Sequence, residues 1–149
     1  MSDVNQGIEP GEVKVSGEGG IAQLIETSTH TLMSDEPVSV GGTDRGPNPY
    51  DLLLAALGSC TAMTVRMYAA RKQWPLDDVS VVLRHSRIHA RDCEHCETEK
   101  GRLDRIEKRV TITGDLDAEQ HERLMQISER CPVHRTLKSE IDIVTLQEA

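Results

Sequence analysis

The residues of this 149-residue chain that are best suited to chemistry are its four cysteines, Cys60, Cys93, Cys96 and Cys131. A thiolate can attack an electrophile, be oxidised to a sulfenic acid, exchange with a disulfide or bind a metal ion. Two of the cysteines stand alone in the sequence and two form a C-x-x-C pair. The element that carries each thiol decides which of these reactions is open to it.

Cys60 lies in the middle of an apolar stretch, Pro49 to Lys72, with the sequence PYDLLLAALGSCTAMTVRMYAARK. A cysteine in such a place is commonly a small packing residue. The middle of a helix also gains little from the helix dipole, which acts over the terminal turns. If Cys60 is reactive, a cation or a hydrogen-bond donor from outside the helix must stabilise its thiolate.

Cys131 is followed by Pro132, and this dipeptide is typical of a helix start with proline in the first turn. A thiol at that position faces unpaired backbone N–H groups, which favour the thiolate. Arg130, His134 and Arg135 add positive charge nearby. The alternative is a plain cysteine at a helix junction.

Cys93 and Cys96 lie in a charged loop, close to His85, His89 and His95. On an extended strand His85 and His89 point to the same side, so a zinc site made of these two histidines and the two cysteines is stereochemically possible. The pattern lacks a second pair of ligands at the spacing that makes zinc motifs specific. The favoured interpretation is a redox-sensitive or exposed pair, and we expect no bound metal or cofactor.

The stretch that carries Cys60 predicts a long helix. Pro49 suits its first turn with Asn48 as the cap, Asp51 places negative charge at the positive end of the dipole, and Trp74-Pro75 stops it after Lys72. One stripe at spacings of three and four consists of Leu53, Ala56, Leu57, Cys60, Met63, Thr64 and Met67. The other faces are apolar as well, which predicts burial on every side, partly by a second subunit. The Gly- and Pro-rich loop before it, residues 40 to 50, is expected to wall a site.

The remaining elements predict an α+β fold with antiparallel strands. We expect a hairpin over residues 12–27 with a turn at 17–20, strands over 29–33, 79–90, 105–113 and 139–146, and a helix capped by Asp117 with Leu124, Ile127, Ser128 and Cys131 on one stripe. Residues 1–10 are expected to be a flexible N-terminus, and residues 11–149 a single domain.

The charge balance argues against nucleic acid, because 17 basic and 25 acidic residues give a net charge of −8 with no basic cluster. The N-terminal sequence lacks the regions of a signal peptide, and the apolar part of the central stretch ends at Arg66, which we take as too short to span lipid. We therefore expect a cytoplasmic protein without a membrane partner, whose cysteines lie in a reducing compartment.

The segment GPNPYDLLLAALGSCTAMT, followed later by ERCPVHRTL, resembles the OsmC/Ohr family of osmotically inducible and organic-hydroperoxide-resistance proteins, over about residues 11 to 146. The resemblance implies an intertwined homodimer in which antiparallel sheets wrap around long central helices. It also implies that Cys60 attacks the O–O bond of an organic hydroperoxide and that Cys131 resolves the sulfenic acid as a disulfide, which a thiol reductant reopens. Helix-end electrostatics instead favour Cys131 as the first nucleophile. We follow the resemblance, since a partner subunit can supply a charge that one sequence does not display.

Two departures from the family pattern concern the activation of Cys60. Efficient peroxidases of this family carry an arginine in the N-terminal strand region and a glutamate near the start of the long helix, whereas residues 1 to 44 here contain no arginine. Arg45 is the remaining candidate cation, and Asp51 is the candidate carboxylate, displaced by one residue because Tyr50 occupies the usual glutamate position. Asp51 could equally act only on the helix dipole. These departures resemble a less characterised branch of OsmC-like proteins.

Two hypotheses of other classes stay open. The missing N-terminal arginine is compatible with a non-peroxidase module that binds a small apolar or electrophilic ligand at the dimer pocket. The C-x-x-C loop is compatible with a zinc-binding interaction protein or, in a peroxidase, with a pair that relays electrons or is merely exposed.

Overall fold

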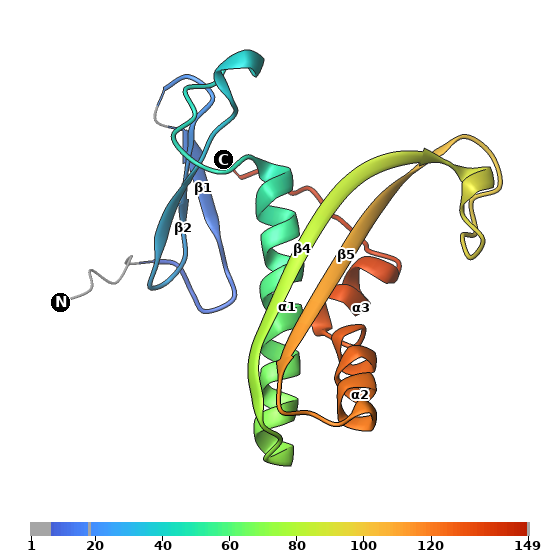
Figure 1. Ribbon diagram of the computed structural model, residues 1–149. Helices are drawn as coiled ribbons and strands as arrows, with labels where there is room; N and C mark the ends of the chain where they lie inside the picture. Colours follow the sequence, from blue (N-terminus) through green and yellow to red (C-terminus); the bar gives the residue numbers. More distant parts are fainter. Residues whose placement is uncertain (1–6, 18, 149) are drawn as a thin grey trace. The chain divides into compact units, whose positions relative to one another are not determined.

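The computed structural model describes residues 7–17 and 19–148, which fall into two compact units that divide between Leu53 and Leu54. Residues 1–6 of the predicted flexible N-terminus and Glu18 of the predicted turn lie outside the described residues. Each unit contains one antiparallel sheet, and together with three helices they confirm the predicted α+β class (Figure 1).

The sheet of the first unit is a meander of three short strands. Strand β1 (Lys14–Gly17) pairs with β2 (Gln23–Glu26), and β2 pairs with β3 (Thr31–Ser34). The predicted hairpin and third strand are confirmed, although each strand is shorter than the apolar pattern suggested. A short 3-10 turn, η1 (Val38–Val40), follows.

The loop after β3 is organised by the buried carboxylate of Asp35. Its oxygens accept hydrogen bonds from the Thr43 hydroxyl at 2.6 Å and from the backbone N–H groups of Glu36, Thr43 and Arg45 at 2.8, 3.1 and 3.2 Å. The Thr43 hydroxyl is the main cause that lowers the pKa of Asp35 to about 2, and the backbone donors add to it against the opposing effect of burial. One carboxylate therefore fixes the backbone path that presents Arg45.

Two glycines allow this loop to pack against the strand end. A Cβ atom on Gly42 would overlap the backbone of Glu36, and a Cβ on Gly46 would overlap the backbone carbonyl of Met33. The Gly-rich segment thus has the demanding backbone path that its composition predicted.

Helix α1 (Pro49–Lys72) begins and ends where the sequence predicted. Asn48 Oδ1 accepts from the Asp51 N–H at 2.9 Å, and Asp51 Oδ2 accepts from the Asn48 N–H at 3.1 Å. This reciprocal pair is the capping-box arrangement, with Asp in the place of the usual Glu or Gln. After Lys72, Gln73 takes a left-handed conformation with φ 57°, which ends the helix.

The face of α1 that is buried differs from the predicted stripe. The buried residues are Leu57, Gly58, Thr61, Val65 and Ala69. Met63 and Met67 of the predicted stripe are 61% and 72% exposed. Spacing could not select the face, because a helix that is apolar nearly all round has no dominant apolar side.

The length and composition of α1 would also allow it to cross a membrane. Its most apolar 18-residue window has a mean hydropathy of 1.4, and 28% of that window is buried. The prediction that this stretch is too short was therefore wrong on length. Length and hydropathy alone do not separate such a span from the core helix of a globular domain.

The second unit is built on a long antiparallel ribbon of β4 (Leu76–His89) and β5 (Arg102–Gly114), both longer than predicted (Figure 1). A 3-10 turn, η2 (Ala90–Asp92), opens the loop between them. Helix α2 (Ala118–Ser128) is capped by Asp117 as predicted, and α3 (Pro132–Lys138) follows. The core joins α1, β4, β5 and α2 through Val65, Ala69, Val79, Ile112, Leu124 and Ile127.

The predicted strand over residues 139–146 does not form in this structure. Its alternating apolar side chains are exposed, with Ile143 at 84% and Leu146 at 81%. A strand needs a hydrogen-bonded neighbour, and the part of the chain that the structure describes offers none to this segment.

Candidate functional site

Cys131 is the N-cap residue of α3, with Pro132 in the first turn. Its sulfur accepts a hydrogen bond from the His134 N–H at 3.3 Å, so the thiol occupies the place that a serine or aspartate oxygen usually takes. The residue is fully buried, at 0% exposure. The sequence-based prediction of a thiol facing the free N–H groups of a helix start is confirmed.

Helix α1 brings Thr61 against this sulfur. The Thr61 hydroxyl, also fully buried, lies 3.5 Å from Cys131 Sγ and 2.8 Å from the backbone carbonyl oxygen of Leu57, so its single hydrogen can be donated to either acceptor. The neighbouring Cys60 is half-buried, and its thiol lies near enough to contribute to the lowered pKa of Cys131. Both unpaired cysteines of the chain therefore meet at the junction of α1 and α3.

Lys108 of β5 completes the site. Its ammonium lies 3.2 Å from the Thr61 hydroxyl, 2.7 Å from the Ser128 carbonyl oxygen and 3.0 Å from His134 Nδ1. A lysine ammonium has three N–H donors and no acceptor, so these three partners use all of them. His134 Nδ1 must then accept, which places the ring proton of a neutral His134 on Nε2.

These contacts shift the pKa of Cys131. Burial raises the pKa of its thiol, but hydrogen bonds from Thr61, from the His134 N–H and from Cys60, together with the charge of Lys108, outweigh burial and lower the pKa. The site therefore stabilises a thiolate inside the protein.

The pKa values of the two other titratable groups of the site, Lys108 and His134, are shifted as well. Burial lowers the pKa of Lys108, while the negative charges of Cys131, Glu129 and Cys60 oppose that change. Burial and the Lys108 charge lower the pKa of His134. A neutral imidazole and a charged ammonium can thus share one hydrogen bond.

The sequence carries a family signature over residues 42–145, which match the family described as OsmC-like protein. The chain belongs to the OsmC-like protein family. No protein with a curated annotation matches the chain in sequence.

Solved structures share the OsmC-like fold. The organic hydroperoxide resistance protein OsmC of Legionella pneumophila is 24% identical, covers 90% of this chain and 94% of its own, and has a TM-score of 0.60. The OsmC-like protein of Mycoplasma pneumoniae is 17% identical, with 87% and 89% covered and a TM-score of 0.63. The organic hydroperoxide resistance protein OhrB of Bacillus subtilis is 22% identical, with 88% and 93% covered and a TM-score of 0.57.

The two further candidates, Arg45 and Asp51, lie in the first unit. Asp51 is exposed and its carboxylate closes the cap of α1, which is the alternative role that the sequence allowed. The backbone N–H of Arg45 is fixed by Asp35, and its side chain is exposed. Their catalytic roles in this OsmC-like protein stay predictions.

The four residues of the zinc site that the sequence allowed but did not favour are engaged in other bonds or exposed. Cys93 and Cys96 form a disulfide with their Cα atoms 5.6 Å apart, where a reducing compartment predicted unlinked thiols. His85 Nε2 lies 2.8 Å from Asp104 Oδ1, and His89 is exposed. Among the described residues no three His, Cys, Asp or Glu side chains are grouped as metal ligands.

Sequence reasoning missed Lys108 and Thr61. The signal for Lys108 was present, because the alternation of β5 puts it on the apolar face between Ile106 and Val110. A lysine on a buried strand face needs partners for its charge, and so marks a site. Thr61 carried no comparable signal, since a threonine in an apolar helix is commonly a packing residue.

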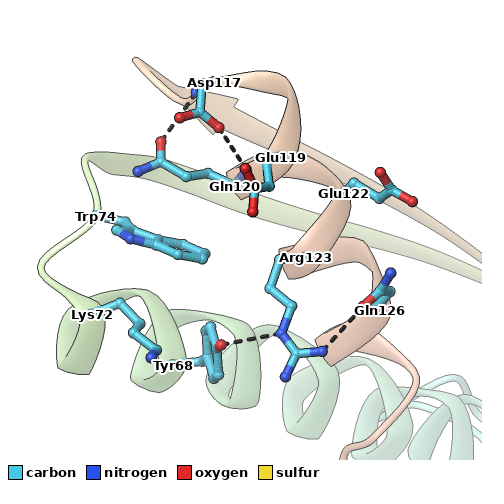
Figure 2. A pocket seen from close by; sticks show the side chains of 9 residues that line it. All are labelled: Tyr68, Lys72, Trp74, Asp117, Glu119, Gln120, Glu122, Arg123 and Gln126. Carbon is cyan, nitrogen blue, oxygen red and sulfur yellow. Dashed lines mark hydrogen bonds between the residues drawn. The ribbon is translucent and has the colours of Figure 1, made fainter.

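A separate hollow of about 570 Å³ lies between the C-terminal end of α1 and helix α2 (Figure 2). Its polar groups bond to one another. Arg123 donates to the Tyr68 hydroxyl at 3.1 Å and to Gln126 Oε1 at 3.1 Å, and Asp117 and Gln120 cap α2. No thiol lines it, so this hollow does not contribute to the chemistry of the cysteines.

Proposed function

We propose that this protein is a thiol-dependent peroxidase that reduces organic hydroperoxides, with Cys60 as the peroxidatic thiol and Cys131 as the resolving thiol. The observation that carries the proposal is the junction of α1, β5 and α3, where the two free cysteines meet beside Lys108 and Thr61. The names of the OsmC and OhrB structures, organic hydroperoxide resistance proteins, support the same reaction class.

Exposure favours Cys60 over Cys131 for the first attack. Cys131 is completely buried, whereas Cys60 is half-buried and can meet a substrate. The Cys60 thiolate attacks one oxygen of the O–O bond, which gives a sulfenic acid on Cys60 and an alkoxide that takes a proton to become the alcohol. Lys108 lies close enough to Cys60 for their charges to interact, and it is the cation that we propose beside the attacking sulfur.

Cys131 then closes the cycle. Its thiolate, which the site stabilises, attacks the sulfenic sulfur of Cys60 and expels hydroxide, which leaves as water, so that a Cys60–Cys131 disulfide forms. A thiol reductant returns both residues to thiols. Each hydroperoxide is therefore reduced to one alcohol and one water by two electrons from the thiols.

In this proposal Lys108 is the activating cation, in place of the arginine that the N-terminal strand region lacks. Arg45 stays a candidate for a second cation, and Asp51 for the carboxylate that holds it, at a site that a partner subunit completes. A homodimer is part of the proposal, because exposed apolar residues line α1 and the C-terminal segment, among them Met63, Met67 and Ile143. Light scattering on the purified protein tests the dimer, and a monomer at micromolar concentration would contradict it.

The test of the function is the consumption of cumene hydroperoxide with dithiothreitol as reductant. The wild type should turn over, and Cys60→Ser should be inactive. In Cys131→Ser, one equivalent of peroxide should leave a sulfenic acid on Cys60 that mass spectrometry locates. Equal consumption by wild type and Cys60→Ser would refute the proposal and favour a module that only binds an apolar ligand.

A further inference from the structure

The Cys93–Cys96 disulfide has no part in the reaction described above. It lies in the loop between η2 and β5, and both of its residues line a hollow of about 260 Å³. The other walls of this hollow come from α1, β5 and α3 and include Leu57, Ile106, His134 and Leu137. A disulfide therefore faces the same elements that carry Cys60 and Cys131.

Two residues of the wall connect the hollow to the site. Leu57 is one helical turn before Cys60, and its carbonyl oxygen accepts the hydrogen bond of Thr61. His134 bonds to Lys108 through its ring and to the Cys131 sulfur through its backbone N–H. The hollow thus ends at residues that directly contact the thiol site.

The exposure of each cysteine decides how readily an external dithiol can reach its sulfur. Cys96 is exposed, Cys93 is half-buried, and Cys131 is fully buried. A protein dithiol must bring its own sulfur against the target sulfur. It therefore reaches the exposed Cys96 more readily than the half-buried Cys60 or the buried Cys131.

We propose that Cys93 and Cys96 are a second redox centre, which takes electrons from a protein dithiol at the surface and passes them to the Cys60–Cys131 disulfide. This inference rests on the proposed peroxidase, since that reaction produces the disulfide that the pair reduces.

The exchange balances in two steps. The Cys93 thiolate attacks the Cys60 sulfur, which forms a Cys93–Cys60 disulfide and releases the Cys131 thiolate. The Cys96 thiolate then attacks the Cys93 sulfur, which closes Cys93–Cys96 and releases Cys60. The external dithiol reduces Cys93–Cys96 by the same two attacks, so two electrons pass for each peroxide.

The site around Cys131 favours the first step. A thiol of low pKa is the better leaving group in thiol–disulfide exchange. Thr61, the His134 N–H and Lys108 together lower the pKa of Cys131 against its burial. Attack on the Cys60 sulfur is also the more accessible route, because Cys60 is the less buried of the two.

The first experiment follows the disulfide through one turnover. Fully reduced wild-type protein receives one equivalent of cumene hydroperoxide, is quenched with N-ethylmaleimide at intervals, and is mapped by mass spectrometry. The disulfide should appear first at Cys60–Cys131 and then move to Cys93–Cys96. A disulfide that stays at Cys60–Cys131 overturns the relay and leaves the peroxidase intact, whereas no oxidation of Cys60 at all overturns both.

The control is Cys60→Ser, in which Cys93 and Cys96 should stay reduced under the same conditions. Formation of Cys93–Cys96 at the wild-type rate in that variant would mean that peroxide oxidises the pair directly, and would overturn the relay.

The second experiment measures steady-state turnover with two reductants, reduced thioredoxin as the protein dithiol and dithiothreitol as the small one. The Cys93→Ser/Cys96→Ser variant should lose about tenfold or more of the thioredoxin-dependent rate and keep its first oxidation by peroxide. A matched variant of the same loop, Glu94→Gln/Glu97→Gln, should keep both. An unchanged thioredoxin rate in the double cysteine variant overturns the proposal.

Discussion

Lys108 Nζ lies 3.2 Å from the Thr61 hydroxyl, and that hydroxyl lies 3.5 Å from the Cys131 sulfur. A half-buried ammonium and a fully buried thiol are therefore joined through one side-chain oxygen. Each group alone would be neutralised by burial, because a low-dielectric surrounding disfavours charge. Hydrogen bonds to the sulfur and the charge of Lys108 together lower the pKa of Cys131. This arrangement makes variants of Lys108, Thr61 and His134 informative.

Replacing Lys108 by Met should reduce activity far more than stability. Hydrogen bonds and charge contacts to an ionised group contribute about 1.5–3 kcal/mol each, which corresponds to about ten- to a hundredfold in turnover. Burial of the Lys108 charge carries a desolvation cost, which also lowers its pKa, and Lys108→Met removes this cost. We therefore expect the free energy of unfolding to fall by no more than about 1 kcal/mol. Peroxide turnover and urea unfolding measure the two effects.

The matched control for this variant is Arg109→Met, the next residue of β5, whose side chain is exposed on the opposite face. It should retain wild-type turnover. If Lys108→Met loses so much stability that its unfolding explains the loss of turnover, the functional role of Lys108 is contradicted.

Replacing Thr61 by Val should raise the pKa of Cys131, because the isosteric side chain removes the hydroxyl that bonds to the sulfur. The thiolate of the variant should therefore form at higher pH than that of the wild type. Thiolate absorbance against pH, in a variant that keeps Cys131 as its sole cysteine, measures it. Thr64→Val, almost one helical turn later on α1, is the control and should leave the titration unchanged.

The pKa of His134 predicts a loss of stability in mild acid. Burial and the Lys108 charge lower this pKa below its ordinary value of 6.5. Between the two values the unfolded chain binds the proton and the folded chain does not, so the free energy of unfolding falls as pH drops below about 6.5. Urea unfolding from about pH 7.5 to about pH 5 should show a shallower fall for His134→Gln than for the wild type. The exposed His121, replaced by Gln, should behave as the wild type does.

The sequence correctly predicted both ends of α1 and the starts of α2 and α3, because capping and helix-stopping residues act within one turn of the chain. Proline, the Asn48 cap and the Trp74-Pro75 stop bound α1 within the chain itself, and Asp117 and Cys131 mark their helix starts in the same way. Such caps act over one turn and are independent of the rest of the fold.

Contacts between distant residues could not be predicted from spacing. The buried face of α1 is chosen by β4, β5 and α2, and Lys108 reaches Thr61 only because the ribbon register and α1 bring them together. The segment 139–146 has a strand pattern, but a strand is completed by a neighbour that its own sequence does not specify. Arg45 could be singled out only by elimination, and its role stays a prediction.

The last prediction concerns Asp35, which fixes the loop that presents Arg45. In Asp35→Asn the carboxylate that accepts from the hydroxyl and N–H of Thr43 and from the N–H of Arg45 becomes an amide with a single acceptor oxygen. We expect faster hydrogen exchange at the Thr43 and Arg45 amides, and weaker turnover if Arg45 acts in the reaction.

The pKa of about 2 also makes the contribution of Asp35 to the free energy of unfolding depend on pH. As the pH falls below about 4, Asp35 takes up a proton in the unfolded chain, where its pKa is near 4, but stays ionised in the folded chain. Its contribution to the free energy of unfolding is therefore complete above about pH 4 and is lost toward about pH 2.

Asp44→Asn in the same loop is the matched control, since the Asp44 backbone N–H bonds to the Glu36 carbonyl whichever side chain it carries. Equal exchange at Thr43 and Arg45 in the two variants would show that Asp35 does not hold the loop.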